Sequence, residues 1–390
     1  MDAPVTTDRR HVCVVTGSRA EFGLLRPVMH AVAQHPALSL SVVAAGSHLV
    51  LPSLTFREVR AEFGAHLAEG VPMQVAGRTT RRDDAEALGV GVSRFARVFD
   101  RLGPAWIVVL GDRIEAFAAA AAASVGGWML AHIHGGDRAE GIADEAMRHS
   151  ISKLAHLHFA ASRESGERLI RMGEQPHRVH VVGSPAIDDL AAIPAMDPDE
   201  FEGLGAPTVV VLMHPIGRSD EVEEADMAAV LAGLQGERVL ALPPNLDPGR
   251  NGIVRAIEAW VPAHPEAQHR AGAFVGTHMT RPRFVGMLKT LAARGGVLVG
   301  NSSAGLVEAA ALRLPVVNVG PRQHGRERAG NAVQVDTPES GALETGVRTA
   351  RTIQRSQITH PYGDGRAGTR IADLLSGADV AGLRRKVCAY

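Results

Sequence analysis

Short β-rich runs alternate with longer helical patterns along the chain, and this alternation constrains the fold more than any other feature. It is typical of parallel sheets joined by crossover helices. The pattern occurs on both sides of the Pro/Asp-rich stretch Pro194 to Pro207, which we interpret as a linker. The predicted strands are His11–Val15, Leu40–Ala44, Trp106–Leu110, Met129–Ile133, Leu157–Ala161 and Val179–Val182, then Thr208–Met213, Val239–Leu242, Ala273–Val275, Val297–Val299, Val316–Val319 and Ala332–Val335.

Two doubly wound α/β domains in tandem follow from this pattern. We place the first, Rossmann-like domain at 8–188 and the second at 206–363, and we expect 364–390 to be a helical tail that packs back on the first domain. Ligands of such sheets bind at the carboxyl ends of the strands. The expected site is therefore a cleft between the two domains.

Composition narrows the class of partner. The 41 Lys and Arg residues balance 42 Asp and Glu residues, so charge favours neither nucleic acid nor an anionic membrane, and we expect a small molecule. The two cysteines, Cys13 and Cys388, lie far apart with no metal-binding or disulfide spacing. The polar N-terminus lacks the apolar core of a signal peptide, and the run Ala116 to Ala123 is too short to span a membrane. We predict a cytoplasmic protein.

The segment Gly300-Asn301-Ser302-Ser303-Ala304-Gly305 lies between a predicted strand and a helical pattern that starts at Leu306. Unpaired backbone N–H groups and the helix dipole make such a turn an anion site, to which Ser302 and Ser303 would add hydroxyl donors. The alternative is a simple helix cap, for which the same residue types are used.

Two strand ends in the first half carry charged side chains. Arg19 lies in the turn after the first strand and could bind a phosphate with two hydrogen bonds, or be a plain surface arginine. Asp112 and Arg113 follow the strand Trp106–Leu110, where Asp112 is either a functional carboxylate or a helix cap.

More polar side chains follow the next predicted strand, Met129–Ile133. His132 and His134 share a strand face, but no third or fourth ligand has a recognisable spacing, so we predict no metal. A cluster of carboxylates follows that could supply a general base, or could be the solvated start of a helix. Its members are Asp137, Glu140, Asp144 and Glu145.

Two further residues end strands of the second half. His214 follows an apolar run and could donate a proton near neutral pH, although a lone histidine is more often structural. Asn245 could bind sugar hydroxyls or cap the following helix.

Taken together, these motifs resemble the UDP-N-acetylglucosamine 2-epimerase family, in particular its hydrolysing branch, over most of the chain. The fold of that family is the GT-B type, two Rossmann-like domains with parallel sheets facing across a cleft. The matching segments are TGSRAEFGLLRPVM (16–29), LGDRIEA (110–116), HIHGGDRAEG (132–141), DEAMRHSISKLAHLHF (144–159), VVGSPAID (181–188), MHP (213–215), GNSSAG (300–305) and NVGPRQHGRERAGN (318–331).

The resemblance implies an elimination that breaks the C1–O bond to UDP as a base removes the C2 proton, followed by water addition to the glucal. It implies no cofactor, and a homodimer or homotetramer. The first-domain roles fall to Arg19 and Arg113, which would contact the diphosphate, and to Asp112 with the carboxylates after His134, which would handle protons. The nucleotide would be held by His214, Ser302, Ser303, Gly305, Glu308 and Arg322.

The chain departs from the family at two positions. Family members carry a glutamate at one of the two positions that His134 and the shorter Asp137 occupy here. The product could therefore be N-acetylmannosamine or a 2,4-diacetamido analogue. A GT-B glycosyltransferase and a catalytically altered hydrolase or nucleotide-sugar binding protein remain alternatives.

Overall fold

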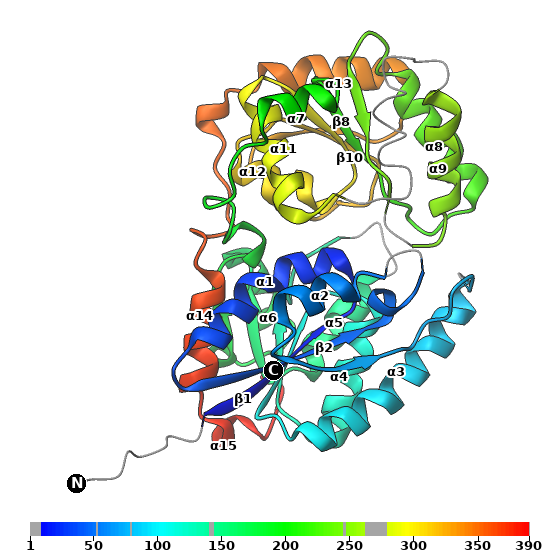
Figure 1. Ribbon diagram of the computed structural model, residues 1–390. Coiled ribbons are helices and arrows are strands. Elements are labelled where there is room, and N and C mark those ends of the chain that lie inside the picture. Colours follow the sequence, from blue (N-terminus) through cyan, green and yellow to red (C-terminus); the bar gives the residue numbers. More distant parts are fainter. Residues whose placement is uncertain are drawn as a thin grey trace. The chain divides into compact units, whose positions relative to one another are not determined.

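A computed structural model describes residues 9–51, 54–78, 80–139, 144–244, 247–261 and 279–389. The chain divides into two compact units. Unit 1 runs up to Asp137, from Asp144 to Asp188 and from Gly363 onward, whereas unit 2 is formed mainly by Asp189–Tyr362. Each unit is a parallel sheet covered by helices (Figure 1), so the prediction of two parallel α/β sheets is confirmed.

The sheet of unit 1 has the strand order β3-β2-β1-β4-β5-β6-β7, and every pair is parallel. The order reverses between β1 and β4, which makes their carboxyl ends the topological switch point. The strands are β1 (Arg10–Thr16), β2 (Leu38–Ala45), β3 (Leu67–Val71), β4 (Trp106–Leu110), β5 (Leu130–Ile133), β6 (Leu157–Ala160) and β7 (Val179–Val181). The helices are α1 (Arg19–Gln34), α2 (Phe56–Phe63), α3 (Arg81–Leu102), α4 (Ile114–Gly126), α5 (Asp144–Leu154), α6 (Arg163–Arg171), α14 (Ala367–Gly377) and α15 (Val380–Leu383).

Successive side chains of β1 alternate between two hydrophobic cores, one on each face of the sheet. Val12 and Val14 join a core that includes residues of α1, α2 and α14, while Cys13 and Val15 join a core with α3, α4 and α5. Successive side chains of a strand point to opposite faces. An apolar run with no polar interruption is therefore buried twice, as expected for a central parallel strand.

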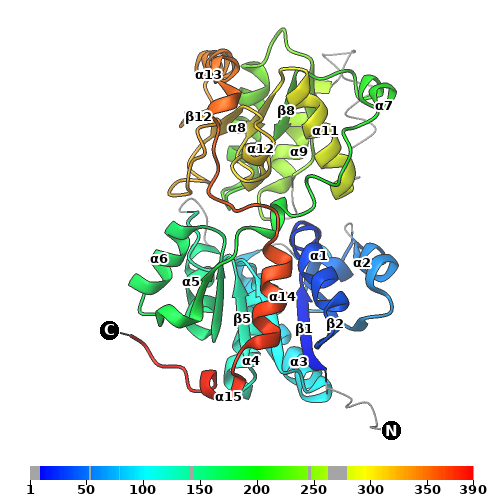
Figure 2. The same ribbon diagram turned by 90° about the vertical axis from the view of Figure 1, so that its left-hand side faces the viewer.

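The end of the chain belongs to unit 1. Helix α14 packs beside α1 (Figure 2), and Asp188 caps it by accepting hydrogen bonds from the backbone N–H groups of Ala367 and Gly368 at 3.0 and 2.6 Å. The buried Arg178 then donates to the carbonyls of Leu383 and Arg385 at 2.8 and 2.9 Å. These contacts fix a segment far away in sequence to the sheet of unit 1.

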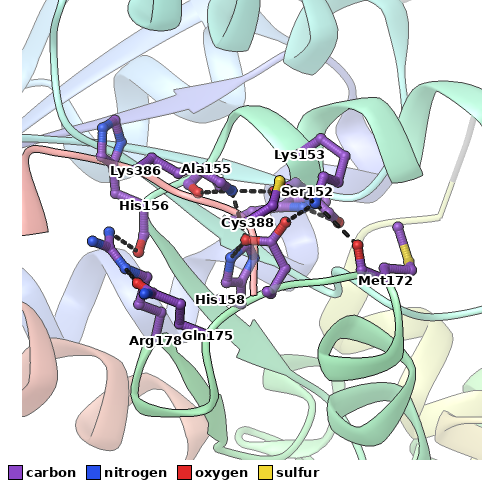
Figure 3. Close-up of polar contacts among 12 residues, drawn as sticks. Ser152, Lys153, Ala155, His156, His158, Met172, Gln175, Arg178, Lys386 and Cys388 are labelled. Carbon is purple, nitrogen blue, oxygen red and sulfur yellow. Dashed lines mark hydrogen bonds and ion pairs between the residues drawn. The ribbon is translucent and has the colours of Figure 1, made fainter. Parts of the chain in front are cut away.

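A buried ion cluster also holds this tail (Figure 3). Glu174, which is 1 % exposed, lies 2.9 Å from His158 Nε2, 2.8 Å from Lys153 Nζ and 2.7 Å from Lys386 Nζ. Lys386 also donates to the carbonyls of Ser152 and Ala155, near the end of α5. The cluster thus joins the tail to α5 and β6, because one carboxylate contacts side chains from three segments.

The sheet of unit 2 has the order β12-β11-β10-β8-β9, again parallel, and its switch point lies between β10 and β8. The strands are β8 (Val209–Leu212), β9 (Val239–Ala241), β10 (Val297–Gly300), β11 (Val316–Val319) and β12 (Ala332–Val335). The described helices are α7 (Pro198–Gly203), α8 (Asp220–Ala232), α9 (Arg250–Trp260), α11 (Arg281–Ala293), α12 (Glu308–Ala311) and α13 (Ser340–Thr352).

Some elements differ from those predicted. Strand β3 was not predicted, because its sequence LAEGV contains Glu69 and Gly70 in place of an apolar run, and it lies at the sheet edge. The supposed linker Pro194 to Pro207 is instead a packed part of unit 2: it contains α7, and Phe201 is fully buried in the core. The predicted strand Ala273–Val275 lies outside the described residues. No helix among those described is long and apolar enough to cross a membrane.

Candidate active site

The loops at the switch point of unit 1 are held together by Glu115, a fully buried residue of α4. Its Oε1 accepts a hydrogen bond from the backbone N–H of Ser47 at 3.4 Å, and its Oε2 accepts one from Arg113 Nε at 3.3 Å. A Cβ atom at Gly17 or at Gly46 would come within 2.4 and 2.3 Å of this side chain. Glycine is therefore required at both positions, and Glu115 fixes the predicted phosphate-binding Arg113.

A second buried carboxyl group, Glu21, lies beside this one. It accepts a hydrogen bond from the backbone N–H of Gly17 at 2.8 Å. Burial, aided by the negative charge of Glu115, raises the pKa of Glu21 to about 8, so this group is largely protonated at neutral pH. The predicted site residue Arg19 pairs with Glu58 at 3.5 Å and remains 19 % exposed.

Arg148 of α5 forms ion pairs with two of the predicted carboxylates of unit 1. It is almost fully buried and forms ion pairs with Asp112 at the end of β4 and with Glu145, the latter at 2.5 Å. The same guanidinium donates to the backbone carbonyl of Asp137 at 3.2 Å. Both carboxylate side chains stay 20 % exposed. One cation thus brings together two predicted proton-handling groups and leaves each of them accessible.

Asp137 has a different environment. It is 5 % exposed, its Oδ1 accepts a hydrogen bond from Ser165 at 2.8 Å, and its Oδ2 lies 3.2 Å from His134 Nδ1. His134 in turn lies 2.9 Å from the hydroxyl of Ser184 and has a φ of +64°, a left-handed conformation that is uncommon for a residue other than glycine. His134 lies just after β5, which ends at Ile133. The prediction that it shares a strand face with His132 is therefore wrong.

At the switch point of unit 2, Asn301 joins the ends of β10 and β8. Its amide accepts from the backbone N–H of His214 at 2.7 Å and donates to the backbone carbonyl of His214 at 2.8 Å. Burial and the nearby charge of Arg322 lower the pKa of His214 to about 3. The imidazole is therefore neutral at physiological pH, and it would act as a hydrogen-bond donor rather than as a cation.

The serine segment differs from the predicted strand–turn–helix. The 3-10 helix η5 (Ser303–Gly305) and the four-residue α12 replace one continuous helix. The carbonyl of Gly305 accepts a hydrogen bond from the side-chain amide of Asn331 at 2.9 Å. Ser302 caps η5 by accepting from the N–H of Ala304 at 3.3 Å. The prediction of a helix dipole at this turn is wrong, because a helix this short has little macrodipole.

Glu308 and Arg322 are the remaining predicted site residues of unit 2. Arg322 donates to the carbonyl of Asn301 at 3.1 Å. Glu308 is 6 % exposed and pairs with Arg281 at 3.3 Å. Ser302, Arg322 and His214 are thus linked through one residue, Asn301, to the edge of the sheet where β8 and β10 end.

The structure brings most of the predicted residues together within their own units. In unit 1 these are Asp112, Arg113, Asp137 and Glu145. In unit 2 they are His214, Ser302, Ser303, Gly305, Glu308 and Arg322. Asn245, Glu140 and the side chain of Asp144 lie outside the described residues.

The sequence analysis did not predict the residues that fix the candidate site residues in place by hydrogen bonds and ion pairs. Arg148 and Glu115 lie inside the quoted motifs, and Glu115 offered an available signal as a charged residue on an otherwise apolar helix. Asn301 was predicted only as a member of the Gly300–Gly305 turn. Arg281 had no signal at all, because its partners Asp189 and Glu308 are distant in sequence.

Among the described residues, no group of three or more His, Cys, Asp or Glu side chains is arranged to hold a metal ion. Two doubly wound parallel sheets, each with polar side chains at its switch point, define an α/β enzyme class of the GT-B type. Within this class, the family model for UDP-N-acetylglucosamine 2-epimerase matches residues 30–376. The chain belongs to that family.

Individual relatives agree with this placement. The chain is 34 % identical to a UDP-N,N'-diacetylbacillosamine 2-epimerase (hydrolyzing) from Legionella pneumophila, over 94 % of this chain and 95 % of that protein. It is 27 % identical to a UDP-N-acetylglucosamine 2-epimerase from Neisseria meningitidis, over 95 % and 96 %. The crystal structure of a Methanocaldococcus jannaschii UDP-GlcNAc 2-epimerase with UDP-GlcNAc and UDP matches with a TM-score of 0.74 at 16 % identity, over 94 % of this chain and all of that one.

Proposed function

We propose that this protein is a hydrolysing 2-epimerase of a UDP-linked N-acetylated amino sugar. It releases UDP together with the free 2-epimer, N-acetylmannosamine or a 2,4-diacetamido analogue, through a glucal intermediate. Family membership supports the nucleotide-sugar substrate. The name of the Legionella pneumophila relative supports both the hydrolytic outcome and a diacetamido sugar.

The observation that carries the proposal is the pairing of Asp112 and Glu145 by Arg148. Elimination requires a base for the C2 proton, and inversion requires a second group that returns a proton to the other face. The guanidinium holds the two carboxylates close together, so that one could remove the C2 proton and the other could return a proton. Their partial exposure allows each to exchange protons with solvent between the two half-reactions.

Asp137 has a supporting role in this scheme. It is 5 % exposed and contacts Ser165 and His134, whereas the side chains of Asp112 and Glu145 are 20 % exposed and therefore more accessible to a substrate. We assign it to the orientation of the loop after β5, to which Arg148 also binds. A direct proton-handling role for Asp137 or Asp144 stays a prediction.

Unit 2 would bind UDP in this scheme. Neutral His214, Arg322 and the hydroxyls of Ser302 and Ser303 are donors suited to the two phosphates. The family resemblance also assigns Arg19 and Arg113 of unit 1 to the diphosphate. Donors prearranged around a leaving group stabilise the charge that develops as the C1–O bond breaks. The rigid amide of Asn301 supports this assignment, because it fixes the backbone on which His214 is placed.

The test is incubation with UDP-N-acetylglucosamine and, separately, UDP-N,N'-diacetylbacillosamine in D₂O. We expect release of UDP and of a free sugar with inverted C2 that carries deuterium, because the new C2 hydrogen comes from solvent. A glycosyltransferase would release UDP only with an acceptor, and a binding protein would release none. Free sugar with an unlabelled C2 would show direct hydrolysis at C1 and would overturn the elimination.

We also propose a cytoplasmic homodimer or homotetramer. The family resemblance supports the assembly, and Cys388, an exposed cysteine outside any disulfide among the described residues, suits a reducing compartment. Light scattering on the eluting protein measures the assembly, and a mass of one chain would overturn it.

A further inference from the structure

Glu21 is a buried carboxyl group with little around it to compensate a negative charge. It lies in the first turn of α1, it is 4 % exposed, and its Oε2 accepts a hydrogen bond from the backbone N–H of Gly17 at 2.8 Å. Its Oε1 is buried as well and has no hydrogen-bond partner among the described residues. Ionisation would leave this oxygen charged and without a donor, which is costly away from water. The contacts therefore favour the protonated acid.

The nearest cation is bound to a different carboxylate. Fully buried Glu115 also packs against Gly17, and its Oε2 accepts a hydrogen bond from Arg113 Nε at 3.3 Å. Burial, aided by the negative charge of Glu115, raises the pKa of Glu21 to about 8, although the N–H of Gly17 and the charge of Arg113 oppose the shift. Two carboxyl groups thus share one guanidinium, and Glu21 is the one that stays neutral.

The other charged groups around α1 have partners of their own. His48 of η1 (Gly46–Leu49) is fully buried, and burial lowers its pKa to about 4, so it is neutral as well. The carboxylates of the neighbouring segments make these contacts: Glu58 with Arg19 at 3.5 Å, Glu62 with Arg26 at 2.7 Å, Asp373 with His35 at 3.5 Å, and Asp188 with the first N–H groups of α14. The charge of Glu21 therefore depends mainly on Glu115, Arg113 and its own burial.

We propose that Glu21 is a positioning residue of the diphosphate site, which holds the turn Gly17–Arg19 as a neutral acid, so that binding of UDP at this turn is coupled to protonation of Glu21. The inference rests on the proposed function, in which Arg19 and Arg113 contact the diphosphate. The negative charge of bound UDP disfavours the ionised form of Glu21. By linkage, ionisation of Glu21 weakens the binding of UDP by the same factor.

The experiment measures the heat of UDP binding by calorimetry at pH 8.5 in Tris and in Tricine. These buffers differ in ionisation enthalpy, so the difference between the two heats gives the number of protons that the complex takes up. If bound UDP raises the pKa of Glu21 by about one, the wild type should take up about half a proton. Its affinity for UDP should be roughly tenfold lower once Glu21 is fully ionised.

Glu21→Gln is the decisive variant. Its amide oxygen can still accept a hydrogen bond from Gly17, but it cannot bind a proton, so the uptake should vanish. The uracil ring of UDP itself loses a proton at alkaline pH, so the affinities of variant and wild type are compared at each pH from 7 to 9. The affinity of the wild type should fall relative to that of Glu21→Gln as the pH rises. A merely structural role would shift the affinity at every pH and leave the uptake unchanged.

Glu62→Gln is the matched control. Glu62 is a carboxylate of α2 that contacts α1 through Arg26, but its side chain is 23 % exposed and lies outside the diphosphate site. Its variant should take up as many protons as the wild type. Glu21→Met, which is neutral and of similar size, serves as the second variant if Glu21→Gln does not fold, as judged by circular dichroism. It loses the acceptor for Gly17 and should also abolish the uptake.

The outcomes separate the two proposals. Wild-type protein that binds UDP without taking up a proton, or an uptake that persists in a folded Glu21 variant, overturns the role of Glu21 while UDP binding stands. Wild-type protein that does not bind UDP at any pH overturns the proposed function itself.

Discussion

Replacing Glu174 by glutamine should destabilise unit 1 by about 3 kcal/mol, because it leaves the partly exposed ammonium groups of Lys153 and Lys386 without their buried carboxylate. Burial alone would raise the pKa of Glu174, but hydrogen bonds from His158, Lys153 and Lys386 outweigh it and lower the pKa to about 2. The ordinary pKa is 4.5. A difference of about 2.5 pKa units corresponds to roughly 3 kcal/mol, which agrees with the cost of breaking a buried ion pair.

The pH dependence follows from the direction of this shift. Because the pKa of Glu174 is lower in the folded than in the unfolded protein, its stabilisation is complete above about pH 4.5. It is lost as the pH falls from there toward 2. The difference between wild type and variant should therefore be largest near neutral pH and shrink at pH 3.

Urea unfolding measures this difference. The fluorescence of Trp106 and Trp128 reports on unit 1, in which both lie. Glu167→Gln is the control, since the Arg163–Glu167 pair of α6 is exposed and should contribute less than about 1 kcal/mol. The reasoning is refuted if Glu174→Gln costs no more than this control, or if its cost is the same at pH 3 and pH 7.

The remaining predictions concern the proposed active site. Asp112→Asn should lower kcat by roughly 10²–10⁴-fold with little change in UDP affinity, and near-normal turnover would remove it from the scheme. His214→Ala should weaken both UDP binding and turnover. Because the pKa of His214 is about 3, this loss should be the same at pH 6 and pH 8. Arg148→Lys should lower kcat by roughly 10- to 100-fold, since a single ammonium cannot reproduce the two separate nitrogens with which the guanidinium contacts Asp112 and Glu145, while the dissociation constant of UDP stays the same. Unchanged kcat would show that the bridge is dispensable.

The strands could be predicted because their signal is local. A central parallel strand is buried on both faces and is therefore a short run of apolar residues, as in Trp106–Leu110, which matches β4 at both ends. Strand β3 lacks this signal because an edge strand has fewer buried faces. The stretch Pro194 to Pro207 was misread for a related reason: proline and aspartate suggested a linker, whereas Phe201 anchors it in the core.

The candidate site was predictable at the level of strand ends, because doubly wound sheets place those ends along one edge. What could not be predicted is how the side chains pair. Arg148 reaches Asp112 across 36 positions, and Asn301 reaches His214 across 87. Neither separation leaves a periodic trace in the sequence. Such contacts depend on which helix packs against which strand, and therefore on the tertiary structure.

The serine segment shows why a local signal can predict the right place for the wrong reason. Ser302 and its neighbours suit the start of a long helix and a 3-10 turn equally well, since both need a capping hydroxyl. In the structure the capped element is only three residues long, so little positive potential comes from a macrodipole. In the proposed function, positive charge for the diphosphate would instead come from side chains, of which Arg322 is anchored to the same turn through the carbonyl of Asn301. The serines would then orient the phosphates by hydrogen bonds, and arginine would supply the electrostatic attraction.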